Sequence, residues 1–392
     1  MNRTVLLVAD NLGLSGKTKA LADLARGLDR ARYRPEVCIL ENETSPLPAL
    51  LRGEGIKVHH VECRKGFDID GLSRFVRMLR TVKPDIVHCY NPRPILYAGA
   101  IARCLGAGVL GSLSAFACQV PDRQYAFLPK ELHTKSLKNV ARNQVCAQVV
   151  GAFAVVSPAL GQRFCRYNRI SSRKVRVVPY GVRVQQPRSS AARTELATHV
   201  RQELGFGPDT VIIGSVGRLV EQKDYPTQFR GFALAARTDP RLRMVLAGDG
   251  PLRAELEQLA AELGIATRVA FLGYRADVPR LLVACDIFVM TSKFEPFGVS
   301  LLEAKAAGCS ILATSVNEIS EIVPHGRAGL LFSSGDSSEM AARLLQLAGN
   351  PALRERLGQQ ALDEASEKHS LPAMITAYQA LYDELAPVTT RF

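Results

Sequence analysis

Residues 286–303 read DIFVMTSKFEPFGVSLLE, and this stretch decides what kind of fold the chain has. Its first part, 286–291, is a short apolar run typical of a strand that is buried on both faces. A loop follows at 292–298, and the residues from Gly298 onward show a helical pattern. Strand–loop–helix units of this kind, repeated along a chain, build a parallel sheet covered by helices.

The same alternation continues in both directions from this stretch. Further strands are predicted at 4–9, 36–40, 56–61, 85–89, 108–113, 151–156, 175–178, 211–216, 243–247, 268–272 and 310–313. Helical patterns lie between most of them, for example at 17–30, 70–81, 94–105, 226–237, 251–263 and 337–348. The alternation pauses at 182–209, so we place a linker near 182–192. The pattern predicts two doubly wound α/β domains, 1–183 and 184–368, and a C-terminal helix in 369–392 that packs back on the first domain.

The composition excludes several classes of protein. With 47% hydrophobic and 22% charged residues, the 392-residue chain is not mostly disordered, and no apolar run is long enough to cross a bilayer. The apolar stretch at 5–9 is too short for a signal peptide. Nine cysteines without a CxxC pair favour a reducing compartment with neither disulfides nor a zinc site. We therefore expect a cytoplasmic protein.

The stretch 286–303 contains two glutamates, one in its loop and one in its helix. Glu295 stands at the carboxyl end of the predicted strand, and Glu303 lies just over one turn into the helix. Carboxylates accept hydrogen bonds from sugar hydroxyls, and free amides at a helix start suit a diphosphate. Taken alone, the simpler interpretation is one loop glutamate and one helix-surface glutamate.

A basic loop follows the strand 211–216. Gly217 lets the backbone turn, and Arg218 and Lys223 are spaced to bracket one diphosphate and stabilise it as a leaving group. Two further turns follow the next strands, Gly248-Asp249-Gly250-Pro251 and Phe271-Leu272-Gly273-Tyr274, and the second could border a nucleotide base. Taken alone, the loop with Arg218 and Lys223 is better explained as an ordinary basic loop, and the turn at 248–251 is at least as well explained as a plain strand–helix turn.

The loop after the first strand reads NLGLSGKT over 11–18. Its end is similar to a phosphate-binding P-loop, but the spacing requires glycine where Asn11 stands, which excludes that motif. The loop still directs the amides around Ser15 and Gly16 toward the carboxyl edge of the sheet, at a helix N-terminus.

Together and in this order, these motifs resemble the family 4 retaining glycosyltransferases of the GT-B fold. The resemblance is clear over about 205–365 and rests on topology in the first half. It implies two Rossmann-like domains facing a cleft, with a nucleotide-diphosphate sugar, a UDP- or GDP-sugar, in the C-terminal domain and the acceptor in the N-terminal one. It also implies retained anomeric configuration, no cofactor and no bound metal.

The resemblance assigns roles residue by residue. Its catalytic residues would be Glu295, Arg218 and Lys223. Its donor-binding residues would be Ser15, Gly16, Gly217, Arg218, Lys223, Gly250, Phe271, Gly273, Tyr274, Glu295, Phe297, Gly298, Val299 and Glu303. For the acceptor, His88 and Ser114 are candidates, although a buried structural histidine is the commoner reason for a histidine like His88.

The sequence departs from the family pattern at three places. Asn317-Glu318 stands where Gly-Gly is usual, Ser114 stands near a usual histidine, and Ser15 replaces a glycine. These departures leave two alternatives open. One is another GT-B enzyme, such as a nucleotide-sugar epimerase or a phosphorolytic enzyme. The other is a scaffold protein that keeps the fold without catalysis.

The charge is unevenly divided between the two halves. The net charge is +13 overall, +16 over 1–185 and −3 over 186–392. Basic residues gather at 123–142, where apolar side chains separate them, and at 163–176. This pattern suits an anionic membrane surface, and no nucleic-acid-binding motif accompanies it. We expect a lipid-linked or anionic acceptor and peripheral binding on the cytoplasmic membrane face; a solvated surface that keeps the protein soluble is the alternative.

Overall fold

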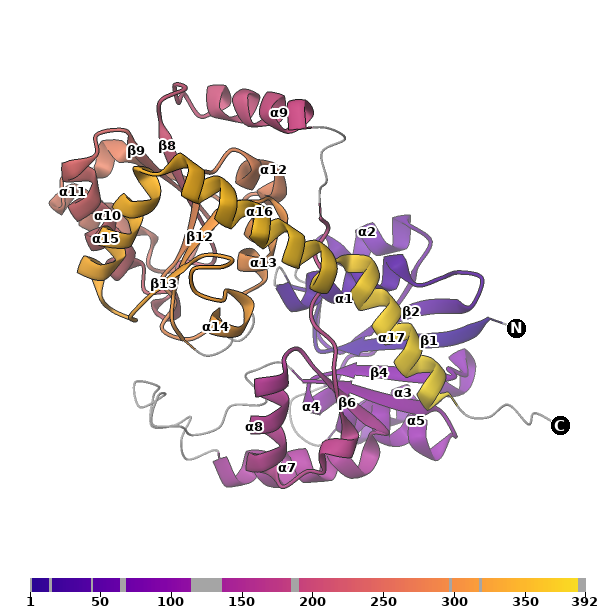
Figure 1. Ribbon diagram of the computed structural model, residues 1–392. Helices are drawn as coiled ribbons and strands as arrows, with labels where there is room; N and C mark the ends of the chain where they lie inside the picture. The colour runs from indigo at the N-terminus through magenta and orange to yellow at the C-terminus, as the bar shows by residue number, and fades with distance from the viewer. Residues whose placement is uncertain are drawn as a thin grey trace. The chain divides into compact units, whose positions relative to one another are not determined.

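The computed structural model describes residues 2–13, 16–43, 45–63, 68–113, 136–184, 190–295, 298–316 and 319–386 (Figure 1). The chain divides into two compact units. The first contains Met1–Gly181 and Leu371–Phe392, and the second contains Val182–Ser370.

A seven-stranded parallel sheet forms the centre of the first unit, in the order β3-β2-β1-β4-β5-β6-β7. Its strands are β1 (Arg3–Ala9), β2 (Tyr33–Ile39), β3 (Lys57–His60), β4 (Ile86–Tyr90), β5 (Gly108–Ser112), β6 (Ala152–Val155) and β7 (Val175–Val177). The chain winds outward from β1 to β3 and then returns to place β4 on the other side of β1. The winding direction therefore changes between β1 and β4.

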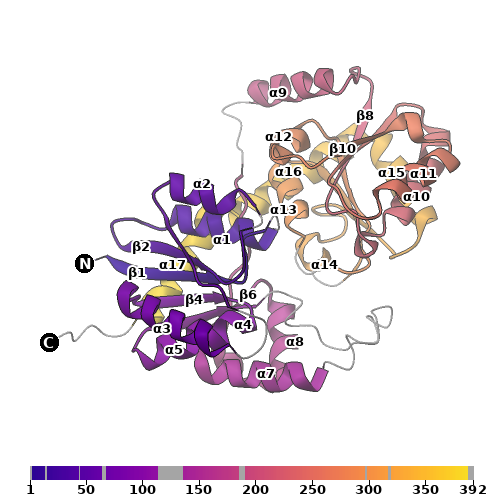
Figure 2. The ribbon, with the colours of Figure 1, turned by 180° about the vertical axis from the view of Figure 1, so that it is seen from behind.

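Helices cover both faces of this sheet, as Figure 2 shows. Leu6 and Val8 of β1 pack into one apolar layer and Val5 and Leu7 into the other, because successive strand residues point to opposite faces. The helices of the first layer are α3 (Ile69–Val82), α4 (Pro92–Pro94), the π-helical turn η1 (Ile95–Gly99), α5 (Ala100–Cys104), α7 (Ser136–Val149) and α8 (Pro158–Asn168). Those of the second layer are α1 (Gly16–Gly27), α2 (Leu47–Gly53) and α17 (Leu371–Leu385).

Helix α17 carries the chain back to the first unit and closes a buried polar network there. The imidazole of His88 in β4 is fully buried; its Nδ1 lies 2.8 Å from the Tyr382 hydroxyl and its Nε2 lies 2.7 Å from Ser112 Oγ. Tyr90 stacks on the imidazole ring and Tyr378 packs beside it. Both ring nitrogens are thus occupied inside the protein, which corrects the expectation that His88 meets an acceptor: its role is to hold α17.

The buried imidazole makes the stability of the first unit depend on pH. Burial lowers the pKa of His88 to about 3, from an ordinary 6.5. Between pH 6.5 and pH 3, His88 is therefore protonated in the unfolded chain and neutral in the folded chain. Its contribution to the free energy of unfolding is complete above pH 6.5 and is lost as the pH falls toward 3. Between these two pH values we expect the free energy of unfolding to fall by up to about 1.4 kcal/mol per pH unit.

This expectation is checked by urea unfolding of the wild type and of His88→Gln at pH 7.5 and pH 5. The wild type should lose more stability than the variant between these two pH values. Equal losses in the two proteins would show that His88 does not carry the pH dependence.

The second unit has a six-stranded parallel sheet in the order β10-β9-β8-β11-β12-β13. Its strands are β8 (Val211–Val216), β9 (Leu242–Ala247), β10 (Val269–Gly273), β11 (Ile287–Met290), β12 (Ser310–Thr314) and β13 (Leu330–Phe332). Its helices are α9 (Ser190–Glu203), α10 (Tyr225–Thr238), α11 (Arg253–Glu262), α12 (Val278–Val283), α13 (Val299–Ala306), α14 (Ile319–Ile322), α15 (Ser337–Ala348) and α16 (Pro351–Lys368). Short 3-10 turns complete the two units: η4 (Ser172–Lys174), η5 (Glu221–Lys223) and η6 (Ala266–Arg268).

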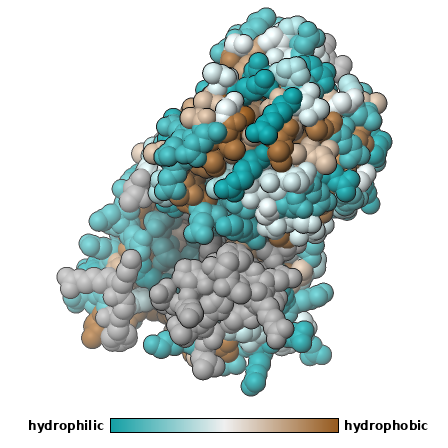
Figure 3. Space-filling view, turned by 90° about the vertical axis from the view of Figure 1, so that its left-hand side faces the viewer, coloured by the Kyte–Doolittle hydropathy of each residue, from teal (hydrophilic) through white to brown (hydrophobic). Residues whose placement is uncertain are grey.

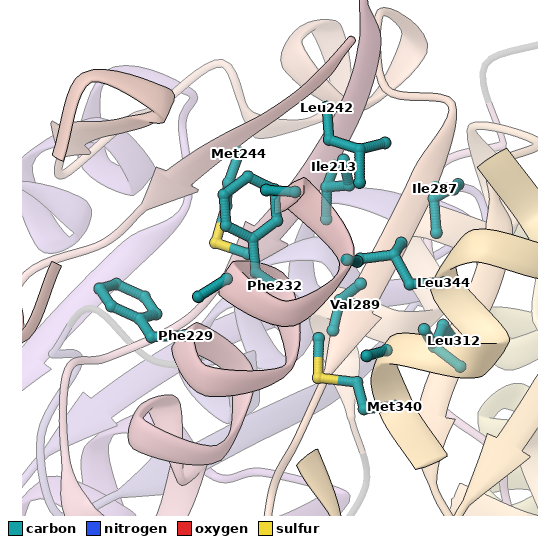
Figure 4. Packing of buried hydrophobic residues seen from close by; sticks show 14 of the residues in the cluster. Ile213, Phe229, Phe232, Leu242, Met244, Ile287, Val289, Leu312, Met340 and Leu344 are labelled. Carbon is teal, nitrogen blue, oxygen red and sulfur yellow. The ribbon is translucent and has the colours of Figure 1, made fainter. Parts of the chain in front are cut away.

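One face of this second sheet packs against α10, α11, α15 and α16. Figure 4 shows Ile213 and Met244 of the sheet meeting Phe232 of α10 and Leu344 of α15, and all four side chains are completely buried. The two sheets with their helices confirm the predicted fold class, two Rossmann-like α/β domains with a C-terminal helix that belongs to the first. The strand β13 and the helix α16 were not predicted.

No helix of the described residues is long and apolar enough to cross a membrane. On the face drawn in Figure 3, hydrophilic side chains interrupt the apolar areas of the described surface.

Candidate functional site

The carboxyl ends of β8 and β11 meet at the centre of the second sheet. These two strands are neighbours although β9 and β10 come between them in sequence, so the winding direction changes here. Ligands of open parallel sheets bind beyond the carboxyl ends of the strands at such a point. The loop that begins at Gly217 leaves β8 here, and the loop leading to Glu295 leaves β11.

An ion pair joins the two loops. Lys223 Nζ donates to Glu295 Oε2, and the two side chains are 16% and 10% exposed. Glu295 also accepts hydrogen bonds from the backbone N–H of Gly298, at 3.1 Å, and from Ser292 Oγ, at 3.3 Å. Burial first, and then the nearby Glu295 carboxylate, raise the pKa of the Tyr225 phenol above its ordinary value. Two of the three predicted catalytic residues, Lys223 and Glu295, are thus in direct contact in a largely enclosed position, and the third, Arg218, is not part of this contact.

Polar residues that the sequence did not single out hold this pair in place. Thr291 Oγ1 donates to the backbone carbonyl of Lys223 at 2.8 Å, and the backbone N–H of Lys293 donates to the carbonyl of Gln222 at 3.0 Å. The buried Gln228 amide oxygen accepts hydrogen bonds from Ser215 and Thr291. These contacts tie the β8 loop to the β11 loop. Nothing in the sequence pattern distinguishes these residues from other polar residues in or beside loops.

Glycines let three neighbouring loops cross at close range. A Cβ on Gly248, whose φ is +145°, would lie 1.9 Å from the carbonyl oxygen of Gly217, and a Cβ on Gly250 would lie 2.4 Å from that of Leu219. The backbone N–H of Gly248 donates to the carbonyl of Gly273 at 2.8 Å, which brings in the loop after β10. The predicted residues Gly217, Gly250 and Gly273 are thus gathered at one edge of the sheet.

The helix α13 begins beside Glu295. Gly298 precedes the helix with φ +62°, in the left-handed region that favours glycine. The first amides of a helix lack partners within it, so those at Val299 and its neighbour face outward from the helix start. Glu303 lies one turn further along the same helix and is half-buried.

The remaining predicted donor residues of this unit lie around the same edge. Arg218 is exposed and has no side-chain hydrogen bond or ion pair to another described residue. Tyr274 is 62% exposed, while Phe271 is partly buried beneath the guanidinium of Arg253, 5.9 Å from its ring centroid. Phe297 lies outside the described residues, as does the pair Asn317-Glu318.

The predicted residues of the first unit are only partly described. Gly16 is the first residue of α1, which begins beyond the carboxyl end of β1. Ser15 and Ser114 lie outside the described residues, as does most of the basic stretch 123–142.

The carboxyl ends of the strands of the second sheet therefore bring together cations, a buried carboxylate and the backbone amides at the start of a helix. Arg218, Lys223 and the start of α13 provide positive potential for a diphosphate, and Glu295 and Glu303 provide acceptors for hydroxyl groups. This combination suits a nucleotide-diphosphate sugar.

Comparison with known proteins gives the family. Residues 197–364 match the family model "Glycosyl transferases group 1", and residues 15–186 match "Glycosyltransferase Family 4". The chain belongs to the family 4 glycosyltransferases. Its two Rossmann-like units are the two halves of the GT-B fold of that family.

Relatives agree with this membership, and a solved structure matches the fold. The chain is 33% identical over 183 residues to the lipopolysaccharide core biosynthesis glycosyltransferase LpsD of Rhizobium meliloti, covering 47% of this chain and 52% of LpsD. It is 30% identical over 185 residues to the N-acetyl-alpha-D-glucosaminyl L-malate synthase of Bacillus anthracis, covering 47% of this chain and 48% of that enzyme. These alignments span about half the length of the relatives. The crystal structure of Anabaena HepE with UDP-glucose matches the fold with a TM-score of 0.80, at 21% identity, over 97% of this chain and 99% of HepE.

Proposed function

We propose that this family 4 glycosyltransferase moves a sugar from a nucleotide-diphosphate sugar to an acceptor, with retention of anomeric configuration and without a metal ion. The Lys223–Glu295 pair at the edge of the second sheet carries the proposal. As the glycosidic bond breaks, negative charge grows on the departing diphosphate, where Lys223 and Arg218 stabilise it. Positive charge grows on the sugar, which Glu295 contacts. Two side-chain cations and the start of α13 supply the stabilisation for which other enzymes use a metal.

The donor is proposed to be a UDP- or GDP-sugar. HepE, which shares the fold, was crystallised with UDP-glucose, and this favours UDP. The relatives' names describe one as a glycosyltransferase of lipopolysaccharide core biosynthesis and the other as a synthase of N-acetyl-alpha-D-glucosaminyl L-malate. They support a role in glycoconjugate synthesis with a lipid-linked or anionic acceptor.

The donor is identified by incubating the protein with UDP-, GDP-, ADP- and dTDP-sugars and measuring release of the nucleoside diphosphate. We expect release of the nucleoside diphosphate from the sugars of one nucleotide only, above all UDP. The rate of this release should increase when a glycan acceptor is added. An epimerase would convert the nucleotide sugar without any acceptor and without releasing the diphosphate, and a scaffold would leave every donor unchanged. Either result would overturn the proposal.

We also propose that the first unit binds an anionic membrane surface from the cytoplasmic side. In the stretch 163–176, Arg166, Arg169 and Arg173 are exposed, whereas Lys174 donates to backbone carbonyls and Arg176 pairs with Glu384. These three arginines have no ion pair with another described residue, and each would add about 1 kcal/mol of attraction near an anionic surface. Co-sedimentation with phosphatidylserine vesicles at low salt is expected, and sedimentation equal to that with phosphatidylcholine alone would exclude it.

A further inference from the structure

A lysine lies enclosed near the end of α13, the helix whose start belongs to the proposed donor site. Lys305 is in the last turn of α13, and its side chain is 1% exposed. Its ammonium donates to the backbone carbonyl of Ile322, the last residue of α14, at 2.6 Å. It also donates to Glu364 Oε2 of α16 at 2.9 Å. One side chain therefore connects three separate helices.

The carboxylate that meets this lysine lies between two cations. The Glu364 side chain is 10% exposed, and its Oε1 lies 2.9 Å from the guanidinium of Arg327, a side chain that is 61% exposed. Burial by itself would raise the pKa of the Glu364 carboxyl, but the hydrogen bond and charge of Lys305 and the charge of Arg327 hold it below its ordinary value. Glu364 is therefore ionised, and Lys305 and Glu364 form a buried ion pair.

A buried ion pair adds little to the stability of a fold. Removing two charges from water costs about as much free energy as their attraction returns, and apolar side chains of similar volume often stabilise a protein equally well or better. The pair does fix a direction, because the ammonium must meet one carbonyl and one carboxylate oxygen. This matters for α13, which has only eight residues and so depends on its contacts to keep its place.

The backbones of α13 and α16 also approach closely in this region. A Cβ on Gly358 of α16 would lie 2.4 Å from the carbonyl oxygen of Gly308, in the turn that follows α13. The N–H of Gly308 in turn donates to the carbonyl of Lys305 at 2.9 Å. The end of α13 is thus seated directly on α16, which packs along it (Figure 1).

The start of the same helix is the part that the proposed donor site uses. The N–H of Gly298 donates to Glu295, and the free amides of Val299 and its neighbour follow. Val299 and Lys305 are about 9 Å apart along a helix axis, since each residue of an α-helix rises about 1.5 Å. Over such a short length a helix moves as one body. A rotation or shift at Lys305 would therefore turn the first amides, and Glu303, away from a bound donor.

We propose that Lys305 is a positioning residue for donor binding. Paired with Glu364, it fixes α13 on α14 and α16, so that the start of the helix and Glu303 face the nucleotide-diphosphate sugar. The identity of this ligand rests on the proposed function. Lys305 itself does not touch the donor and acts only through α13.

The test replaces both charges together, in the full-length variant Lys305→Met/Glu364→Leu. Removing one partner alone would leave the other charge buried without its counter-charge and would destabilise the fold. The double variant should melt within about 3 °C of the wild type or above it. Its affinity for the nucleoside diphosphate that the wild type binds, UDP or GDP, should be about tenfold weaker in calorimetric titration. Amide hydrogen exchange in α13 should be about tenfold faster, with exchange in the strands of the second sheet unchanged.

The matched control is Glu367→Leu/Lys368→Met. It makes the same two exchanges on α16, one turn or less from Glu364, but at exposed positions. Nucleotide affinity and the exchange of α13 should both equal those of the wild type.

Three results would overturn the proposal. They are wild-type nucleotide affinity in Lys305→Met/Glu364→Leu, unchanged exchange of α13 in that variant, and a large fall in its melting temperature, which would make the pair a stabilising element of the fold. A wild-type protein that binds neither nucleotide would overturn the proposed function instead. Hydrogen exchange needs no ligand, so it would still decide whether Lys305 fixes α13.

Discussion

Replacing Lys223 with alanine is expected to lower kcat/KM for sugar transfer by about 10²–10³-fold, the usual effect of removing one preorganised group that stabilises developing charge. The ammonium of Lys223 is held beside Glu295, with both side chains largely enclosed, so its charge acts in a medium that screens it less than water does. In the proposed mechanism, only Arg218 and the start of α13 would then remain to stabilise the leaving diphosphate.

The matched control for this variant is Lys293→Ala. Lys293 lies in the neighbouring β11 loop and faces Glu221, a side chain that is 89% exposed, at 3.8 Å. The same charge is thus removed from the same region, but from a solvent-screened position, and activity should stay within about twofold of the wild type. Steady-state rates with a saturating acceptor distinguish the two variants. A Lys223→Ala enzyme as active as Lys293→Ala would exclude Lys223 from the reaction.

Replacing Gly248 with alanine is expected to destabilise the second unit by more than about 3 kcal/mol and to abolish nucleotide binding. The new Cβ would lie 1.9 Å from the carbonyl oxygen of Gly217, so the loops after β8 and β9 must separate. The β8 loop carries Arg218 and Lys223, and its displacement would move both cations away from the diphosphate.

Gly264→Ala separates this steric effect from the ordinary cost of a left-handed backbone. Gly264 also has a positive φ, +70°, but a Cβ there meets no atom within 4 Å. Its replacement should cost only about 1–2 kcal/mol and leave nucleotide affinity unchanged. Chemical unfolding and nucleotide titration of both variants provide the test. Equal stability of the two variants would show that the close approach of the loops at Gly248 and Gly217 does not contribute to the stability of the second unit.

Much of the fold was predictable because buried parallel strands are short apolar runs. The run at 211–216 coincides with β8, and the run at 243–247 differs from β9 by one residue. The strands β7 and β13 have three residues each, but only β7, with the sequence Val-Arg-Val, shows the alternation and the β-branched residues typical of a strand. The Leu-Leu-Phe of β13 lacks both signals. Helix α16 buries mainly small side chains, such as Ala361 and Ala365, among many charged ones, so its apolar face is weak in sequence.

The motifs of the proposed donor site were recognisable in the sequence because each follows a strand, whereas contacts between distant loops were not. The pairing of Lys223 with Glu295 requires β8 and β11 to be neighbours, and the hydrogen bond from Asn91 Nδ2 to Asp10 Oδ2 requires the same of β1 and β4. Strand order in a sheet does not follow sequence order, so neither pair could be predicted from spacing. For a related reason the sequence could not decide between the acceptor role of His88 and the commoner buried structural role, since the helix that buries it lies almost three hundred residues further along the chain.

The central claim, that the edge of the second sheet binds a nucleotide diphosphate through Lys223, is tested most directly by calorimetric titration of the full chain with UDP and GDP. We predict one site per chain for one of these nucleotides, with affinity at least about tenfold weaker in Lys223→Ala and unchanged in Lys293→Ala. Binding of neither nucleotide, or equal affinity in all three proteins, would contradict the account.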